Sequence, residues 1–144
     1  MNFLKRFLDY AIFSSALLLI FLVVFEQFLT IPGFVKWIGH WHPLVLHFPI
    51  VMILVTIIQY WRKDMYFDWF LSSTTIFSFL TAITGFLLSM EGESKGDLIL
   101  VHQWLGISVS FILGIWYWIN QFSSRKIISP VILQGILLVC AREP

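Results

Sequence analysis

Long apolar runs alternate with short polar segments along the whole chain. Four of the runs are long enough to cross a bilayer, and they cover residues 10–31, 43–61, 67–90 and 98–122. A helix needs about 20 apolar residues to span roughly 30 Å of hydrocarbon, and a lipid-exposed backbone must bond within its own segment, so each run predicts a transmembrane helix. A fifth run begins at residue 127 and has only about 15 residues, which indicates a short or re-entrant helix, or a full helix in a chain that has been cut.

This pattern predicts an all-α fold, a polytopic transmembrane helical bundle with four clear spans and a shorter fifth one. Residues 1–144 leave no room for a second domain. No small-residue cleavage site follows the first run, so we interpret it as an uncleaved helix rather than a signal peptide. The composition agrees, because 59% of the residues are hydrophobic and 12% are charged, whereas soluble domains have about 25% charged residues.

Charge and cysteine content exclude two kinds of function. The formal net charge of +1 offers no general attraction for nucleic acid, so we expect no nucleic-acid binding. Cys140 is the single cysteine, and the chain has no C-x-x-C-H attachment sequence for a c-type haem. Any haem bound by this chain is therefore expected to be held without a covalent link.

Basic residues flank the spans unevenly and predict an orientation. Lys and Arg in short loops stay preferentially on the cytoplasmic side. With the N-terminus in the cytoplasm, that side receives Lys5, Arg6, Arg62, Lys63, Arg125 and Lys126, while the other side receives Lys36, Lys95 and Arg142. We therefore predict a multi-pass protein of the bacterial inner (cytoplasmic) membrane with a cytoplasmic N-terminus.

Aromatic residues near the ends of the runs agree with this arrangement, since Trp and Tyr concentrate at both membrane interfaces. The predicted inner belt consists of Tyr60, Trp61, Tyr66, Trp69, Trp116, Tyr117 and Trp118, and the predicted outer belt of Trp37, Trp41 and Trp104.

The order of the spans places all four histidines at one end of the bundle. His40, His42 and His47 lie at the start of the second span, and His102 lies near the start of the fourth. Glu91 belongs to the polar hairpin that joins the third and fourth spans at the same end. The predicted orientation makes this the extracytoplasmic end.

Two prolines and two sets of small residues add local expectations. Pro43 suits the first turn of a helix, whereas Pro49 lies inside the helix and frees the carbonyl of Val45. Small residues near His102 and in the preceding span indicate close helix packing, or space for a flat ligand. We expect Gly85 to meet the face of residues 106–114. The two sets are Thr81, Gly85 and Ser89, and Gly106, Ser110 and Gly114.

The segment "HPLVLHFPIVMILV", followed by "TAITGFLLSMEGESKGDLILVHQWLG", resembles a family of bacterial predicted membrane proteins of unknown function with an H-P-x-x-x-H-F-P motif. The resemblance covers a four-helix unit from about residue 39 to 144, which makes the helix at 10–31 an additional N-terminal span. Family members often continue into an extracytoplasmic c-type cytochrome domain of the planctomycete type. The resemblance therefore implies a cytochrome-type partner outside the membrane.

Two classes of function remain open from the sequence. In the first, the protein is a membrane redox subunit in which His47 and His102 face each other and bind a b-type haem. A variant of this hypothesis places copper or zinc between His42, His47, His102 and Glu91, since imidazole and carboxylate ligands suit these metals.

In the second class, the protein binds no cofactor and is a membrane anchor or assembly subunit for the extracytoplasmic partner. Its histidines and acids then form a hydrogen-bonded plug between helix ends. A transporter is disfavoured, because the polar residues do not continue across the bilayer as a pathway requires.

Overall fold

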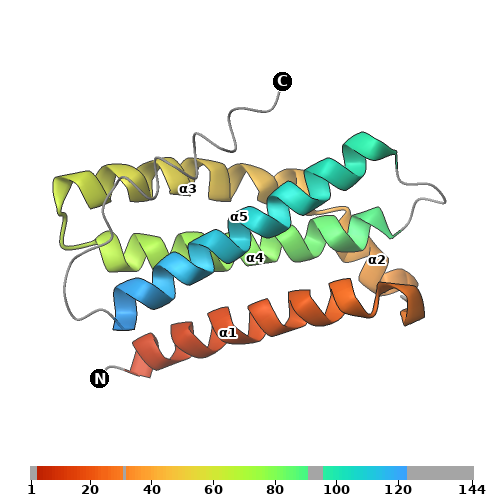
Figure 1. The fold of residues 1–144 in the computed structure, drawn as a ribbon, viewed down its shortest axis with the longest axis horizontal. Coiled ribbons are helices and arrows are strands. Elements are labelled where there is room, and N and C mark those ends of the chain that lie inside the picture. Colours follow the sequence, from red (N-terminus) through yellow and green to blue (C-terminus); the bar gives the residue numbers. More distant parts are fainter. Residues whose placement is uncertain (1–2, 31, 91–95, 123–144) are drawn as a thin grey trace.

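The structure, a computed structural model, describes residues 3–30, 32–90 and 96–122. In these residues every regular element is helical, in agreement with the predicted all-α bundle (Figure 1). The helices are α1 (Phe3–Val24), the 3-10 turn η1 (Glu26–Phe28), α2 (Gly33–Gly39), α3 (His42–Arg62), α4 (Phe67–Ser89) and α5 (Asp97–Phe122).

Four of these helices, α1, α3, α4 and α5, are long and apolar enough to cross a membrane. The protein is therefore a multi-pass membrane protein whose outer surface contacts lipid, as the apolar runs predicted. The short fifth run predicted from residue 127 lies outside the described residues.

The ends of α3, α4 and α5 lie within one residue of their predicted limits, but the first helix differs. It runs from Phe3 to Val24 instead of covering residues 10–31. The helix extends through the charged residues at its start, because long Lys and Arg side chains at a helix end can reach the aqueous interface. It stops early where η1 begins, and the short helix α2, which was not predicted, follows Pro32.

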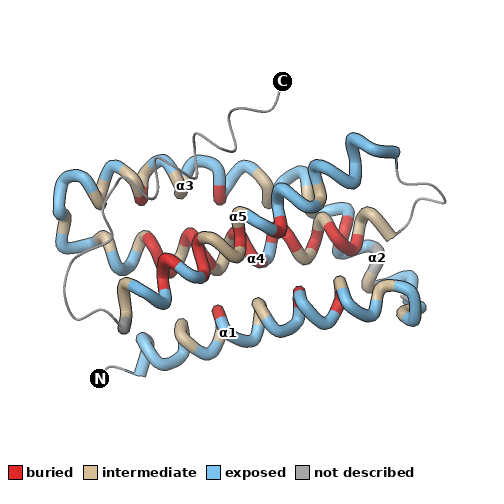
Figure 2. The backbone as a smooth tube through the Cα atoms, in the orientation of Figure 1, coloured by how far each residue is buried: buried red, intermediate tan, exposed pale blue. Residues whose placement is uncertain are grey.

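α4 is the central element of the bundle. It lies between α3 and α1 and is crossed by α5, and it also packs against α2 (Figure 1). In the most apolar stretch of each helix, 61% of the α4 residues are buried inside the protein, against 11% for α1 and for α3. Figure 2 accordingly shows buried residues along most of α4 and only isolated ones on α1 and α3.

Hydroxyl side chains explain why α4 occupies the centre. Its buried polar residues need hydrogen-bond partners that lipid cannot supply, so this helix must face protein on several sides. The Thr74 hydroxyl lies 2.7 Å from that of Thr56 on α3, and the Ser78 hydroxyl lies 2.9 Å from that of Ser110 on α5. These bonds tie α4 to both neighbours near the middle of its length.

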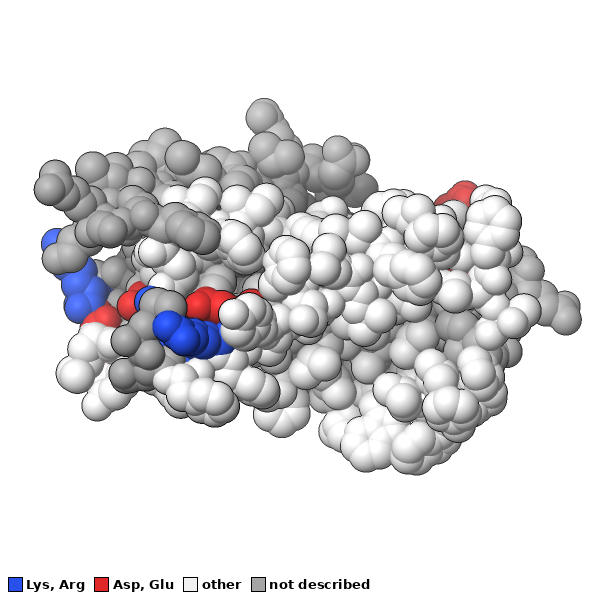
Figure 3. Space-filling model, turned by 90° about the horizontal axis from the view of Figure 1, so that it is seen from below, with Lys and Arg blue, Asp and Glu red and all other residues white. Residues whose placement is uncertain are grey.

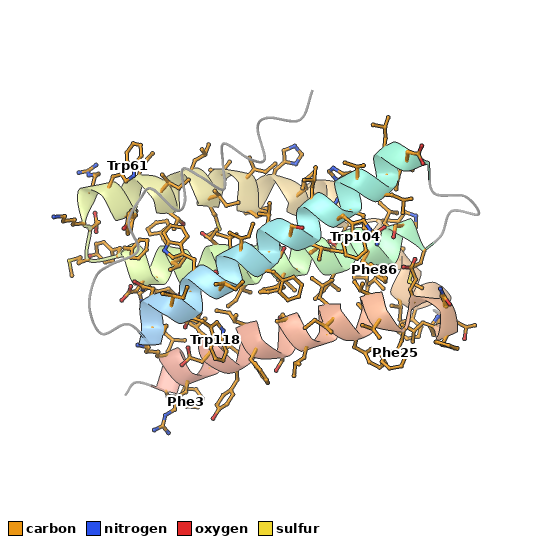
Figure 4. All side chains as sticks on the ribbon, viewed as in Figure 1. Phe3, Phe25, Trp61, Phe86, Trp104 and Trp118 are labelled. Atoms are coloured by element: carbon orange, nitrogen blue, oxygen red, sulfur yellow. The ribbon has the colours of Figure 1, made fainter. Side chains whose placement is uncertain are left out.

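The predicted aromatic belts need a correction at one end. Trp61 is exposed at the end of α3, and Trp104 is exposed near the start of α5 (Figure 4). Trp116 and Tyr117, however, are only 7% and 2% exposed and belong to the core. The pattern of the sequence marked them as interfacial, but α5 turns them toward α3, α4 and α1 instead.

Candidate functional site

The helix ends that carry the histidines gather at one end of the bundle, as the order of the spans predicted (Figure 1). A cavity of about 550 Å³ begins there and extends between α3, α4 and α5 toward the middle of the bundle. Its walls are mainly apolar, and its polar lining groups include two histidines. The lining residues are His42, Leu46, Pro49, Ile50, Ile53, Ser78, Thr81, Ala82, Gly85, Phe86, Leu88, Ser89, Ile99, His102, Gln103, Leu105, Gly106 and Val109.

His42, the first residue of α3, lies against α4. Its Nδ1 is 3.0 Å from the carbonyl oxygen of Thr81, and its ring rests on Gly85. A carbonyl only accepts hydrogen bonds, so Nδ1 carries the proton in this bond. In the neutral ring, Nε2 is then unprotonated and can accept a hydrogen bond or bind a metal.

His102 on α5 is the residue that faces His42. The centroids of the two rings are 6.3 Å apart, and the ring planes meet at 81°. The two imidazoles come from helices that are not consecutive in the chain, and both line the cavity. This juxtaposition is the most specific polar feature of the cavity.

His47 does not take the place predicted for it. Its Nδ1 donates to the carbonyl oxygen of Pro43 at 2.9 Å, and it does not line the cavity, whereas His102, which like His47 is exposed, does. His47 follows His42 by five residues, which on an α-helix is a rotation of about 140° beyond a full turn. The prediction that His47 and His102 face each other is therefore wrong, and His42 occupies that position.

The predicted four-ligand metal site is not found in the part of the chain that the structure describes. There, no group of three or more His, Cys, Asp or Glu side chains could hold a metal ion. Glu91, one of the four predicted ligands, lies outside the described residues. His40 is exposed at the end of α2 and does not line the cavity.

The carbonyl that Pro49 frees lies near the Thr81 hydroxyl, which shares its single proton between two carbonyls. The Thr81 hydroxyl lies 3.4 Å from the carbonyl oxygen of Val45, in addition to its 2.8 Å bond to Phe77 in the preceding turn of α4. Thr81 thus contacts α3 twice, through its hydroxyl at Val45 and through its carbonyl at His42. The proline predicted in the helix interior is consequently accommodated by α4.

The small residues serve two different purposes. Thr81, Gly85, Ser89 and Gly106 line the cavity, and a Cβ added at Gly106 would meet nothing within 4 Å. Deeper in the bundle, a Cβ added at Gly114 would contact the Phe79 ring at 3.3 Å, so this glycine packs closely. α4 and α5 are therefore neighbours as predicted.

The expected contact of Gly85 with the face of residues 106–114 is wrong. The His42 ring occupies the surface of Gly85, and a Cβ added there would lie 2.7 Å from His42 Cε1. A ring from α3 therefore fills the space that was assigned to α5.

Gln103 was missed by the sequence analysis. Its side chain lines the cavity beside His102, and its buried Oε1 has no hydrogen-bond partner among the described residues. A buried amide oxygen without a partner is unusual and indicates a place where a ligand or water can bond. The sequence feature that could have indicated Gln103 is its position as a polar residue directly after His102, inside an apolar run.

Polar contacts at the opposite end of the bundle were also missed. The Tyr117 hydroxyl donates to Asp9 Oδ1 at 2.6 Å, and the Asn120 amide donates to Asp68 Oδ1 at 2.8 Å. Figure 3 shows most of the visible charged side chains at this end, with an uncharged surface over the middle of the molecule. These contacts join α5 to α1 and α4 far from the cavity.

Comparison with known proteins adds no identification. No family model, no curated protein and no solved structure matches the chain. The resemblance carried by the H-P-x-x-x-H-F-P motif therefore stays a prediction.

Proposed function

We propose that the protein is a membrane redox subunit in which His42 and His102 bind a b-type haem at the end of the bundle. The observation that carries this proposal is the pair of imidazole rings, 6.3 Å apart, at the polar end of a largely apolar cavity. Haem iron is commonly held by histidine nitrogen, and the porphyrin supplies its other four ligands. Two histidines are therefore sufficient, whereas a bare zinc or copper ion usually needs more ligands.

The spacing of the rings supports this proposal. The ring centroids are 6.3 Å apart, so His42 and His102 are close enough that both would hold one metal centre, since a metal–imidazole bond is about 2.0 Å long. The Nδ1–H bond of His42 to a backbone carbonyl is the usual accompaniment of a ligating histidine, because it orients the ring.

The remainder of the cavity suits an apolar molecule. Its volume of about 550 Å³ lies within the range of roughly 300–1,000 Å³ that is usual for ligand sites. Leu46, Ile50 and Ile53 on α3 and Leu105 and Val109 on α5 line it. When bound, the haem would supply one-electron chemistry, while these side chains exclude water and the two histidines hold it.

The proposal includes the orientation inferred from the basic residues. Arg62 ends α3 and Lys63 follows it, and Lys5 and Arg6 lie in the first turns of α1, at the end opposite the histidines. A cytoplasmic position for this end, in the bacterial inner membrane, leaves the histidine end facing outward. An extracytoplasmic c-type cytochrome domain could then exchange electrons with the site over a short distance.

An absorption spectrum of the purified full-length protein tests the proposed function. Protein produced with added haem precursor and isolated in mild detergent should show a Soret band that shifts on reduction, with close to one haem per chain. Elemental analysis of the same sample would detect copper or zinc instead. A protein with neither haem nor metal, even after titration with haem, would contradict the proposal and favour the anchor or assembly role.

A further inference from the structure

The His42 ring packs directly on Gly85, where only a residue without a side chain leaves room for it. A Cβ built at Gly85 would lie 2.7 Å from Cε1, 2.9 Å from Nδ1 and 3.3 Å from Nε2 of His42. Real Cβ contacts under 3.0 Å essentially do not occur. Any side chain at position 85 would therefore push the imidazole away from α4.

The displaced ring would lose its hydrogen bond. In the structure the ring approaches α4 closely enough for Nδ1 to donate to the Thr81 carbonyl at 3.0 Å. The Thr84 hydroxyl donates to the same carbonyl at 3.0 Å, and its oxygen is 3.5 Å from His42 Nδ1. These contacts place Nδ1 among groups of α4, while Nε2 is the ring nitrogen that makes none of these hydrogen bonds.

Thr81 also contacts the part of α3 that follows His42. The Thr81 hydroxyl approaches the Val45 carbonyl, which lacks its helical partner because Pro49 has no N–H. The first turns of α3 thus contact α4 at two points, through the His42 ring and through the freed carbonyl of Val45. A bond at two points restrains both the position and the rotation of this end of α3.

We propose that Gly85 and Thr81 are positioning residues for His42, and that together they hold its ring in the Nδ1–H tautomer with Nε2 free to bind. A histidine without such a bond exchanges between two neutral tautomers, of which one has its proton on Nε2 and cannot use that atom as a ligand. The inference deepens the proposed function, because it identifies what prepares the ligating atom. It concerns the protein before any haem is bound.

Nitrogen NMR of the ring-labelled full-length protein tests this proposal without added haem. Spectra are recorded at about pH 8, where imidazole is neutral, and a His42→Gln variant assigns the His42 signals. In the wild-type protein we expect a protonated Nδ1 and an unprotonated Nε2 for His42. In Gly85→Ala we expect the two nitrogens to move toward averaged positions, as the second tautomer becomes populated.

Gly106→Ala is the matched control, because it adds the same methyl group to the opposite wall of the cavity, where a Cβ meets nothing within 4 Å. It should leave the His42 signals unchanged. A wild-type spectrum with the proton on Nε2, or a folded Gly85→Ala protein with unchanged His42 signals, would overturn the proposal. If Gly85→Ala does not fold, the wild-type tautomer alone decides, and neither result depends on whether the protein binds haem.

Discussion

Two glycines, Gly39 and Gly85, bring other parts of the chain into direct contact with α4. Gly85 admits the His42 ring, whereas a Cβ at Gly39 on α2 would lie 2.7 Å from the backbone nitrogen of Leu88 and 3.0 Å from its Cα. A ring can rotate away, but the backbone of a central helix cannot move without disturbing its other contacts. The two positions therefore differ in what a substitution does.

We expect Gly39→Ala to destabilise the protein by about 1–3 kcal/mol, the range for overpacking a closely packed site. The added methyl group would separate α2 from α4. Thermal unfolding in detergent would measure this, with Gly33→Ala as control, since a Cβ there meets nothing within 4 Å. Equal stabilities of the two variants would contradict the close approach of α2.

At the level of single residues, the sequence predicted which end of the bundle carries the site but not which histidine enters it. His47 lies deeper in an apolar run than His42, and this position favoured it as the histidine of the site. Which face of α3 turns inward depends on its packing against α4, and one decisive part of that packing, the space above Gly85, is visible only in three dimensions.

At the level of elements, α4 holds α3 and α5 through hydroxyl groups as well as apolar contacts. The Thr81 hydroxyl compensates for the proline inside α3. Pro49 could be predicted to free a carbonyl, because proline lacks an N–H. The hydroxyl that approaches this carbonyl could not be predicted, because Thr81 belongs to another helix.

A double-mutant cycle tests this compensation. Thr81→Val should destabilise the protein by about 1–3 kcal/mol, the usual range for a buried carbonyl left without a partner. In a Pro49→Ala background the backbone N–H restored at position 49 can bond to the Val45 carbonyl, so the same Thr81→Val change should cost about 1 kcal/mol less. Additive effects in denaturant titrations would show that Thr81 does not serve this carbonyl.

The serine pair between α4 and α5 provides a second test at this level. Ser110 Oγ is 2.9 Å from Ser78 Oγ and also donates to the Ser78 carbonyl at 3.0 Å. Interhelical hydrogen bonds in membrane proteins average about 0.6 kcal/mol, so the Ser78→Ala and Ser110→Ala changes should couple by about that amount. A coupling energy of zero would indicate that the two hydroxyls do not interact.

At the level of the whole molecule, the four long apolar helices and the shared location of the histidines followed from the lengths and order of the apolar runs. The cavity could not be predicted from these runs, because it arises from the way α5 crosses α4 beside α3 (Figure 1). The central role of α4 could have been inferred from its many Ser and Thr residues, since lipid cannot satisfy buried hydroxyls.

The proposed orientation makes a direct prediction for this arrangement. With Cys140 replaced by serine, a cysteine at Asp97 should react with a membrane-impermeant reagent from the periplasmic side of intact cells. A cysteine at Lys63 should react only after the inner membrane is opened. The opposite pattern would reverse the orientation and place the histidine end in the cytoplasm.

The central claim, that His42 and His102 form the binding site, is tested most directly by haem titration of three single variants. His42→Ala and His102→Ala should each lose the Soret band of the bound form or bind haem at least roughly tenfold more weakly, because each removes one ligand. His47→Ala should bind haem like the wild-type protein, since this histidine lies outside the cavity. Loss of binding in His47→Ala, with His42→Ala unaffected, would contradict the account.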